Sequence, residues 1–140
     1  MKDKRKKVLE VDRLFQAFIK ENKDDFYELL PADITPTQFI LLSTIKETAN
    51  CKAADIAQIL CFSPAAVTHL VDRLNANDWV DRVRSEKDRR IVWLKPTKKG
   101  QELLRRVQKK RYDMLLQRFA NVNEEQLESL IGMLKVMLKK

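Results

Sequence analysis

Hydrophobic positions recur with helical spacing along most of the 140-residue chain. Apolar residues three or four positions apart predict helices over residues 4–29, 36–48, 53–60, 63–77, 98–120 and from 124 onward. Two short segments, WVDRVRS and RRIVWLK, are instead rich in Val, Ile and Trp. They flank a charged stretch, which predicts an antiparallel hairpin. We therefore expect a mainly α fold with one small β-hairpin.

Start and stop signals support these boundaries. Thr35 opens the segment TPTQ, which has the residue types of a capping box and a proline for the first turn. Ser63 and Pro64 form a similar start for the helix 63–77, and Asn123 precedes two acidic residues at the start of the last helix. Pro96 has no N–H to donate to a sheet, so we expect the second strand to end there.

The helix 63–77 has two contrasting faces. The apolar positions follow the i, i+3, i+4, i+7 pattern of a buried face: Val67, Leu70, Val71 and Leu74. The opposite face carries small and hydrogen-bonding side chains: Ala65, Thr68, His69, Asp72 and Arg73. A helix that enters the major groove of DNA needs such a face, with room for close approach and donors for base edges and phosphates. An ordinary amphipathic helix with a solvated side would show the same pattern.

The neighbouring segments favour the DNA-binding interpretation. The helix 53–60 is joined to the helix 63–77 through little more than the pair CF, as in a helix-turn-helix. The hairpin that follows has the charged tip RSEKDRR, residues 84–90. This order predicts a winged helix-turn-helix, in which basic side chains of the wing contact the minor groove or flanking phosphates. Asp88 is spaced to hold the Arg90 guanidinium by a charge-assisted bond, although the tip could also be no more than a soluble turn.

Two stretches resemble a known family. The run DRRIVWLKPTKKG (88–100) is similar to the wing signature of MarR-type bacterial transcription regulators, and SPAAVTHLVDRL (63–74) resembles their recognition helix. The resemblance implies an obligate homodimer that binds pseudo-palindromic double-stranded DNA, usually as a repressor. It also implies release from DNA by a small aromatic or lipophilic effector. There are three departures from the family pattern: Cys61 and Asp78 stand where many relatives have glycine, and Pro96 replaces a common leucine.

The resemblance also assigns DNA-binding roles to individual residues. The recognition-helix positions that would face DNA are Ser63, Ala65, Thr68, His69 and Arg73. In the wing, Asp88 and Arg90 match the family's pair, with Arg90 as the minor-groove residue, and the expected phosphate contacts are Arg84, Lys87 and Arg89. The implied organisation is an N-terminal dimerisation helix (1–35), a winged helix-turn-helix DNA-binding domain (36–100) and C-terminal dimerisation helices (101–140).

The terminal helices carry more apolar surface than a winged domain of about 65 residues can cover. The dimerisation residues that we expect are Val8, Val11 and Phe15 in the first helix and Leu127, Leu130, Ile131, Leu134 and Leu138 in the last. Packing against the same helices of a second copy would bury this surface. A closed bundle within one chain is the alternative.

Charge is distributed unevenly. The formal net charge is +8. Residues 1–62 contain 10 basic and 10 acidic groups, whereas residues 63–100 and 101–140 each contain 9 basic and 5 acidic groups. This asymmetry favours a polyanionic partner, although simple solubility would also account for it. No apolar run approaches the length of a membrane span and the N-terminus is not a signal peptide, so we expect a cytoplasmic protein without a membrane partner.

Candidate chemistry beyond DNA binding is sparse. No nucleophile–base arrangement, phosphate loop or metal motif is present, so we expect no enzymatic activity, no catalytic residues, no metal and no cofactor. Cys51 and Cys61 are interpreted as small buried hydrophobic residues. Two other functions stay open at this level: an RNA-binding or ribosome-associated basic protein, and a dimeric adaptor whose winged domain binds protein.

Overall fold

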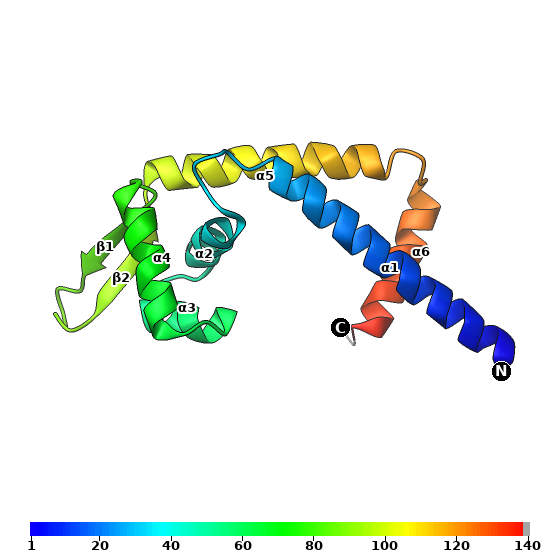
Figure 1. Ribbon diagram of the computed structural model, residues 1–140, viewed down its shortest axis with the longest axis horizontal. Helices are drawn as coiled ribbons and strands as arrows, with labels where there is room; N and C mark the ends of the chain where they lie inside the picture. Colours follow the sequence, from blue (N-terminus) through cyan, green and yellow to red (C-terminus); the bar gives the residue numbers. More distant parts are fainter. Residues whose placement is uncertain (139–140) are drawn as a thin grey trace. The chain divides into compact units, whose positions relative to one another are not determined.

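The computed structural model describes residues 1–138, which form six helices and one two-stranded sheet (Figure 1). In chain order the elements are α1 (Lys2–Glu28), α2 (Pro36–Glu47), α3 (Ala53–Leu60), α4 (Pro64–Ala76), β1 (Val80–Arg84), β2 (Val92–Pro96), α5 (Lys98–Arg118) and α6 (Glu124–Met137). The predicted fold class, mainly α with a small hairpin, is confirmed. Two compact units are present: the first is Met1–Val107, and the second begins at Gln108 within α5.

The core of the first unit is built around α2. Leu41, Leu42 and Ile45 are almost completely buried because α2 contacts α3, α4 and β2. The C-terminal end of α1 joins this core through Phe26, whose ring lies edge-on to that of Phe39 with centroids 5.5 Å apart. Other buried members come from every element of the winged region: Ile34, Cys51, Ile56, Ala57, Val67, Val71, Leu74, Trp79, Val80, Leu94, Leu103 and Val107.

The predicted caps are present. Thr35 Oγ1 accepts a hydrogen bond from the Gln38 backbone N–H at 3.1 Å, and Gln38 Oε1 accepts one from the Thr35 N–H at 3.0 Å. Asn123 and Gln126 form the same reciprocal pair at the start of α6, at 2.8 and 3.0 Å. Each pair satisfies two backbone donors that a helix start otherwise leaves free.

Helices α3 and α4 are inclined at 116°, within the usual range of a helix-turn-helix. Cys61 makes the turn in left-handed backbone geometry, with φ 56°, and its side chain is exposed. The expectation that both cysteines are buried is therefore wrong for Cys61, because the turn directs its side chain to solvent. No single helix among residues 1–138 is long and apolar enough to cross a membrane, although α3 and α4 together have the length and composition of a bent span.

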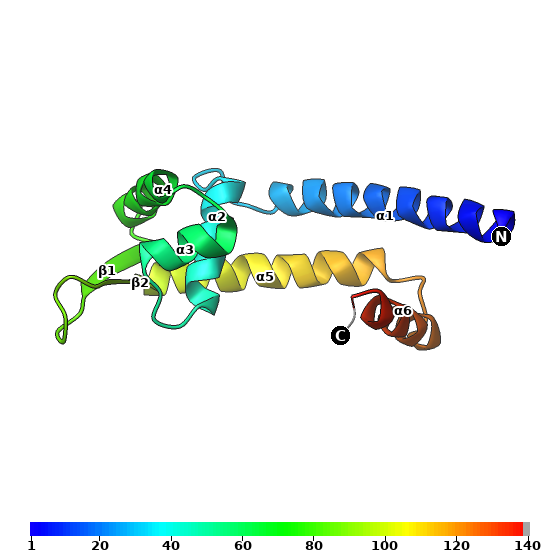
Figure 2. The ribbon, with the colours of Figure 1, turned by 90° about the horizontal axis from the view of Figure 1, so that it is seen from below.

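Strands β1 and β2 are antiparallel, with Val80 opposite Pro96 and Arg84 opposite Val92. Strand β2 ends at Pro96, as its missing N–H predicts. Beside the hairpin, the Leu94 N–H donates to the Cys51 carbonyl at 2.9 Å, so a segment before α3 pairs with β2. In both ribbon views the hairpin tip projects away from the helices of this unit (Figures 1 and 2).

The terminal helices contain no buried residue in the single chain. In α1, Val8 and Val11 are 56% and 48% exposed, and in α6 Ile131 and Val136 are 51% and 79% exposed. Phe15, Leu127, Leu130 and Leu134 are half-buried, while Leu138, just after α6, is exposed. Apolar side chains on these helices therefore retain large accessible surfaces within one chain.

Candidate nucleic-acid interface

Helix α4 is held in a defined orientation by its buried face. Val67, Val71 and Leu74 are at most 1% exposed, and Leu70 is half-buried rather than fully buried. Ser63 starts the helix, because its Oγ accepts a hydrogen bond from the Ala66 N–H at 3.1 Å. The opposite face of α4 carries polar and small residues and is exposed to solvent.

The exposed face of α4 contains every recognition-helix position named above: Ser63, Ala65, Thr68, His69 and Arg73. The exposed Thr68 hydroxyl donates to the Pro64 carbonyl at 3.0 Å, so its proton is engaged while the oxygen can still accept a hydrogen bond. Arg73 Nε donates to His69 Nε2 at 3.2 Å across one helical turn. This face therefore offers small, acceptor and cationic groups together.

Asp72 lies on the same side of α4 but is bound within the protein. Its carboxylate forms an ion pair with the Arg82 guanidinium of β1, and the two side chains are 59% and 36% exposed. Asn75 adds a second link between the helix and the hairpin, since its side-chain amide donates to the Val80 carbonyl at 2.9 Å. These contacts, which the sequence did not reveal, position α4 relative to the wing.

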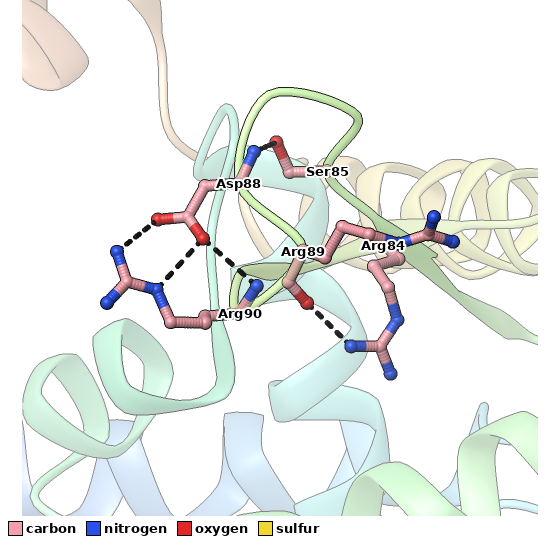
Figure 3. A network of polar contacts seen from close by, with 5 residues as sticks. All are labelled: Arg84, Ser85, Asp88, Arg89 and Arg90. Atoms are coloured by element: carbon pink, nitrogen blue, oxygen red, sulfur yellow. Dashed lines mark hydrogen bonds and ion pairs between the residues drawn. The ribbon is translucent and has the colours of Figure 1, made fainter.

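At the wing tip, Asp88 holds Arg90 by two parallel hydrogen bonds, as predicted (Figure 3). Arg90 Nε and Nη2 each donate to a carboxylate oxygen at 3.0 Å, and the Arg90 backbone N–H adds a third bond at 3.1 Å. The Arg90 guanidinium holds the pKa of the Asp88 carboxyl below its usual value, and Asp88 raises the pKa of Arg90. The Arg90 side chain is 90% exposed, so it is fixed while remaining accessible.

Further bonds within the tip define its shape. Arg84 Nη1 donates to the Arg89 carbonyl at 2.6 Å, and the Asp88 N–H donates to Ser85 Oγ at 3.3 Å (Figure 3). Arg84 thus stabilises the loop, in addition to the phosphate contact that the resemblance predicts for it. Lys87 and Arg89 are exposed. The role of Ser85 was missed, although a serine beside a tight turn is a usual signal for such a bond.

The hairpin is anchored at its base by the segment PTKKG. Thr97 Oγ1 accepts from the Gly100 N–H at 2.9 Å and donates to the Asp78 carbonyl at 2.6 Å. Gly100 packs directly against the backbone of Trp79. The sequence singled out this run by resemblance alone, whereas the structure shows that it joins β2, α5 and the end of α4.

Cys61 and Asp78, the two positions where the resemblance to MarR-type regulators led us to expect glycine, have left-handed backbone geometry. The φ values of Cys61 and Asp78 are 56° and 62°. The helix-turn-helix and the entry to the hairpin therefore keep the backbone geometry that glycine favours, and the Cβ atoms of Cys61 and Asp78 add strain there.

The thiol of the other cysteine, Cys51, is less reactive than an exposed one, because burial raises its pKa. Within residues 1–138, no group of three or more His, Cys, Asp or Glu side chains is arranged to hold a metal ion.

Helices α3 and α4 and the following hairpin place this chain in the class of winged helix-turn-helix proteins. A model of the MarR family matches residues 34–92. The chain is 32% identical over 108 residues to YhbI of Bacillus subtilis (strain 168), an uncharacterized HTH-type transcriptional regulator, covering 74% of this chain and 70% of that one. It is 28% identical over 101 residues to the HTH-type transcriptional repressor MdtR of the same organism, covering 71% and 65%.

A solved structure is similar over nearly the full length. The crystal structure of a mutant MarR from E. coli complexed with operator DNA matches with a TM-score of 0.69 and 25% sequence identity, covering 94% of this chain and 96% of that chain. The sequence similarity and the structural similarity together assign the family. The chain belongs to the MarR family and is a transcriptional regulator of that family.

Proposed function

We propose that this protein is a homodimeric repressor that binds a pseudo-palindromic DNA operator and is released from it by a small molecule. The observation that carries the proposal is the pairing of an exposed hydrogen-bonding face on α4 with a wing whose Arg90 is fixed by Asp88. The repressor MdtR and the operator-bound MarR support it as relatives. Operator binding would localise the protein with the bacterial chromosome, in the cytoplasm.

The proposed DNA contacts are of two kinds, one from α4 and one from the wing. Thr68, His69 and Arg73 would contact base edges in the major groove, where hydrogen-bond patterns distinguish the base pairs, while Ser63 and Ala65 allow close approach of the helix. The wing would provide the other contacts: Arg90 in the minor groove, oriented by Asp88, with Arg84, Lys87 and Arg89 near phosphates. A guanidinium already held in place loses less conformational entropy on binding.

The homodimer is proposed from the terminal helices, with residues 1–35 and 101–140 as dimerisation regions and 36–100 as the DNA-binding domain. Val8, Val11, Ile131 and Leu138 are about half or more exposed, and a second copy would cover them together with their half-buried neighbours on α1 and α6. A twofold axis would present two α4 helices about 34 Å apart, one turn of B-DNA. An inverted repeat in the operator follows from this symmetry.

A test begins with duplexes selected from a randomised DNA library by the purified protein. We expect the selection to enrich an inverted repeat whose half-sites lie one helical turn apart. Light scattering should show that a dimer binds this repeat. Binding to structured RNA with equal affinity, or no binding to any nucleic acid, would overturn the proposal in favour of an RNA-binding protein or a protein-binding adaptor. The effector, proposed from the family relationship alone, is tested by adding small phenolic compounds to the preformed complex.

A further inference from the structure

His69 and Arg73 form a hydrogen-bonded pair on the exposed face of α4. They are four residues apart, and Arg73 Nε donates to His69 Nε2 at 3.2 Å. A neutral imidazole has one nitrogen that donates and one that accepts, so this bond requires the ring proton to be on Nδ1. His69 is the only histidine in the 140 residues. The pair therefore exists in one protonation state of a single, identifiable group.

The bond has a consequence for the guanidinium. An arginine side chain presents its five N–H groups as a planar fork on a flexible stem. When Nε is bound to His69, the stem and the plane of the fork are held, and both terminal nitrogens remain available. Those two nitrogens can contact O6 and N7 of a guanine, the commonest specific arginine contact in the major groove.

We propose that His69 is a positioning residue that orients the Arg73 guanidinium for a guanine contact, and that protonation of His69 releases it and lowers sequence preference. This inference rests on the proposed operator binding and adds regulation by proton concentration to it. It assigns to His69 an action through Arg73 rather than through a base contact alone.

Among the charged groups near His69, Arg73 is the one whose hydrogen bond would be lost when the imidazole is protonated. Helix α4 packs against α2, α3 and β1. The charged side chains on those elements are Lys46, Glu47, Asp55, Asp81, Arg82 and Arg84. Within residues 1–138, none of them forms an ion pair or a hydrogen bond with the imidazole, which is bonded to Arg73 instead. Asp72, the acid nearest in sequence on α4, is bound to Arg82.

Protonation would act on specific and nonspecific binding in opposite directions. An imidazolium cannot accept from Arg73 Nε, and it places two positive charges one helical turn apart, which is unfavourable. The same added charge attracts DNA phosphates regardless of sequence. Histidine is the side chain that ordinarily changes charge between about pH 5 and 8. Acidification should therefore reduce the ratio of operator affinity to random-DNA affinity.

The experiment measures that ratio with the full-length protein, using the duplex selected from the randomised library and a scrambled duplex of the same composition, at several pH values from 8 to 5.5 and constant ionic strength. For the wild type we expect the ratio to fall about tenfold, the effect of losing one good base contact. His69→Gln retains an acceptor for Arg73 but cannot take up a proton, so its ratio should not change with pH. His69→Leu, without an acceptor, should be low and level.

The results separate this inference from the proposed function. If the wild type binds neither duplex at pH 8, both are overturned. If operator preference is clear at pH 8 but the wild type and His69→Gln have the same pH profile, or His69→Leu keeps the full ratio, only the role of His69 is overturned. Circular dichroism and thermal unfolding of each variant check that the helix content and the stability match those of the wild type. Arg73→Lys, which lacks the fork, should have a low ratio at every pH.

Discussion

The carboxylate of Asp72 on α4 forms an ion pair with the guanidinium of Arg82 on β1, which ties the recognition helix to the first strand of the wing. Because both side chains are partly exposed, Asp72→Asn should lower the free energy of unfolding by less than about 1 kcal/mol. The freed Arg82 becomes available to a phosphate, which should steepen the salt dependence of nonspecific DNA binding by about one unit of slope. Titrations at several salt concentrations measure this.

The matched control is Asp81→Asn, which removes the same charge from the residue of β1 that precedes Arg82. Asp81 does not pair with Arg82, so its substitution leaves the Asp72–Arg82 bond in place. An equal change in slope for both variants would show that net charge, and not release of Arg82, is responsible.

Gly100 packs against Trp79 so tightly that a Cβ would overlap the carbonyl oxygen and lie 3.1 Å from the carbonyl carbon. Gly100→Ala should therefore destabilise the protein by about 1–3 kcal/mol, because backbone atoms must move to admit the methyl group. Gly132→Ala in α6 is the control, since apart from the adjoining backbone of α6 nothing in the chain lies within 4 Å of its added Cβ. That variant should gain about 0.5–1 kcal/mol from the greater helix preference of alanine. Urea denaturation at one protein concentration compares the two.

Arg90→Ala should weaken operator binding by about tenfold or more, the effect of losing one charge-assisted hydrogen bond, while the thermal unfolding midpoint stays nearly the same. Asp88→Asn retains the arginine but weakens the two bonds that orient it, so an intermediate loss is expected. Fluorescence anisotropy with labelled operator provides the measurement. Operator affinity of Arg90→Ala equal to that of the wild type would remove the wing from the interface.

The Asp88–Arg90 pair also predicts a pH effect. Arg90 lowers the pKa of Asp88, so the ordered wing persists above the ordinary carboxyl pKa and is lost only as the pH falls through the lower value in the folded protein. In the His69→Gln background, operator affinity should accordingly stay level from pH 8 to about 5. A loss of operator affinity between pH 8 and about 5 in that variant would contradict the lowered pKa of Asp88.

Cys61 has a left-handed backbone with φ 56° and ψ 38°. Cys61→Gly should stabilise the protein by about 0.5–1 kcal/mol, since relief of the strain exceeds the entropy that glycine adds to the unfolded chain. Cys61→Ala is the control, because alanine loses the thiol but keeps the Cβ. Differential scanning calorimetry should show a higher midpoint for glycine alone, and equal midpoints for the two variants would argue against backbone strain.

The exposed apolar residues of the terminal helices predict the assembly state. Val11→Glu and Ile131→Glu should each shift the protein toward monomer at micromolar concentration, because a carboxylate would be buried in the proposed interface. Gln58→Glu adds the same charge at an exposed position of α3, outside the proposed dimerisation regions, and should leave the mass unchanged. Light scattering decides the matter, and a wild type that is already monomeric would contradict the dimer.

Much of the fold follows from interactions within a few residues. The capping box of Thr35 and the cap at Ser63 each bond three positions ahead, so residue types and spacing suffice to place those helix starts. The exposed face of α4 follows from helical periodicity, and the Asp88–Arg90 pair from a separation of two residues. The last position of β2 follows from the missing N–H of Pro96. Each of these features depends on short-range geometry that a sequence displays directly.

Tertiary structure decided the contacts between segments that are distant in sequence. Asp72 reaches Arg82 ten residues away, the Thr97 hydroxyl bonds a carbonyl 19 residues before it, and the Cys51 thiol lies against the carbonyl of Leu94, 43 residues on. Residue types at such separations are compatible with many partners, and only the packed backbone selects one. Two local features were also decided by the structure. The turn directs the Cys61 side chain to solvent, and helical spacing brings His69 and Arg73 near each other without determining which of their atoms meet.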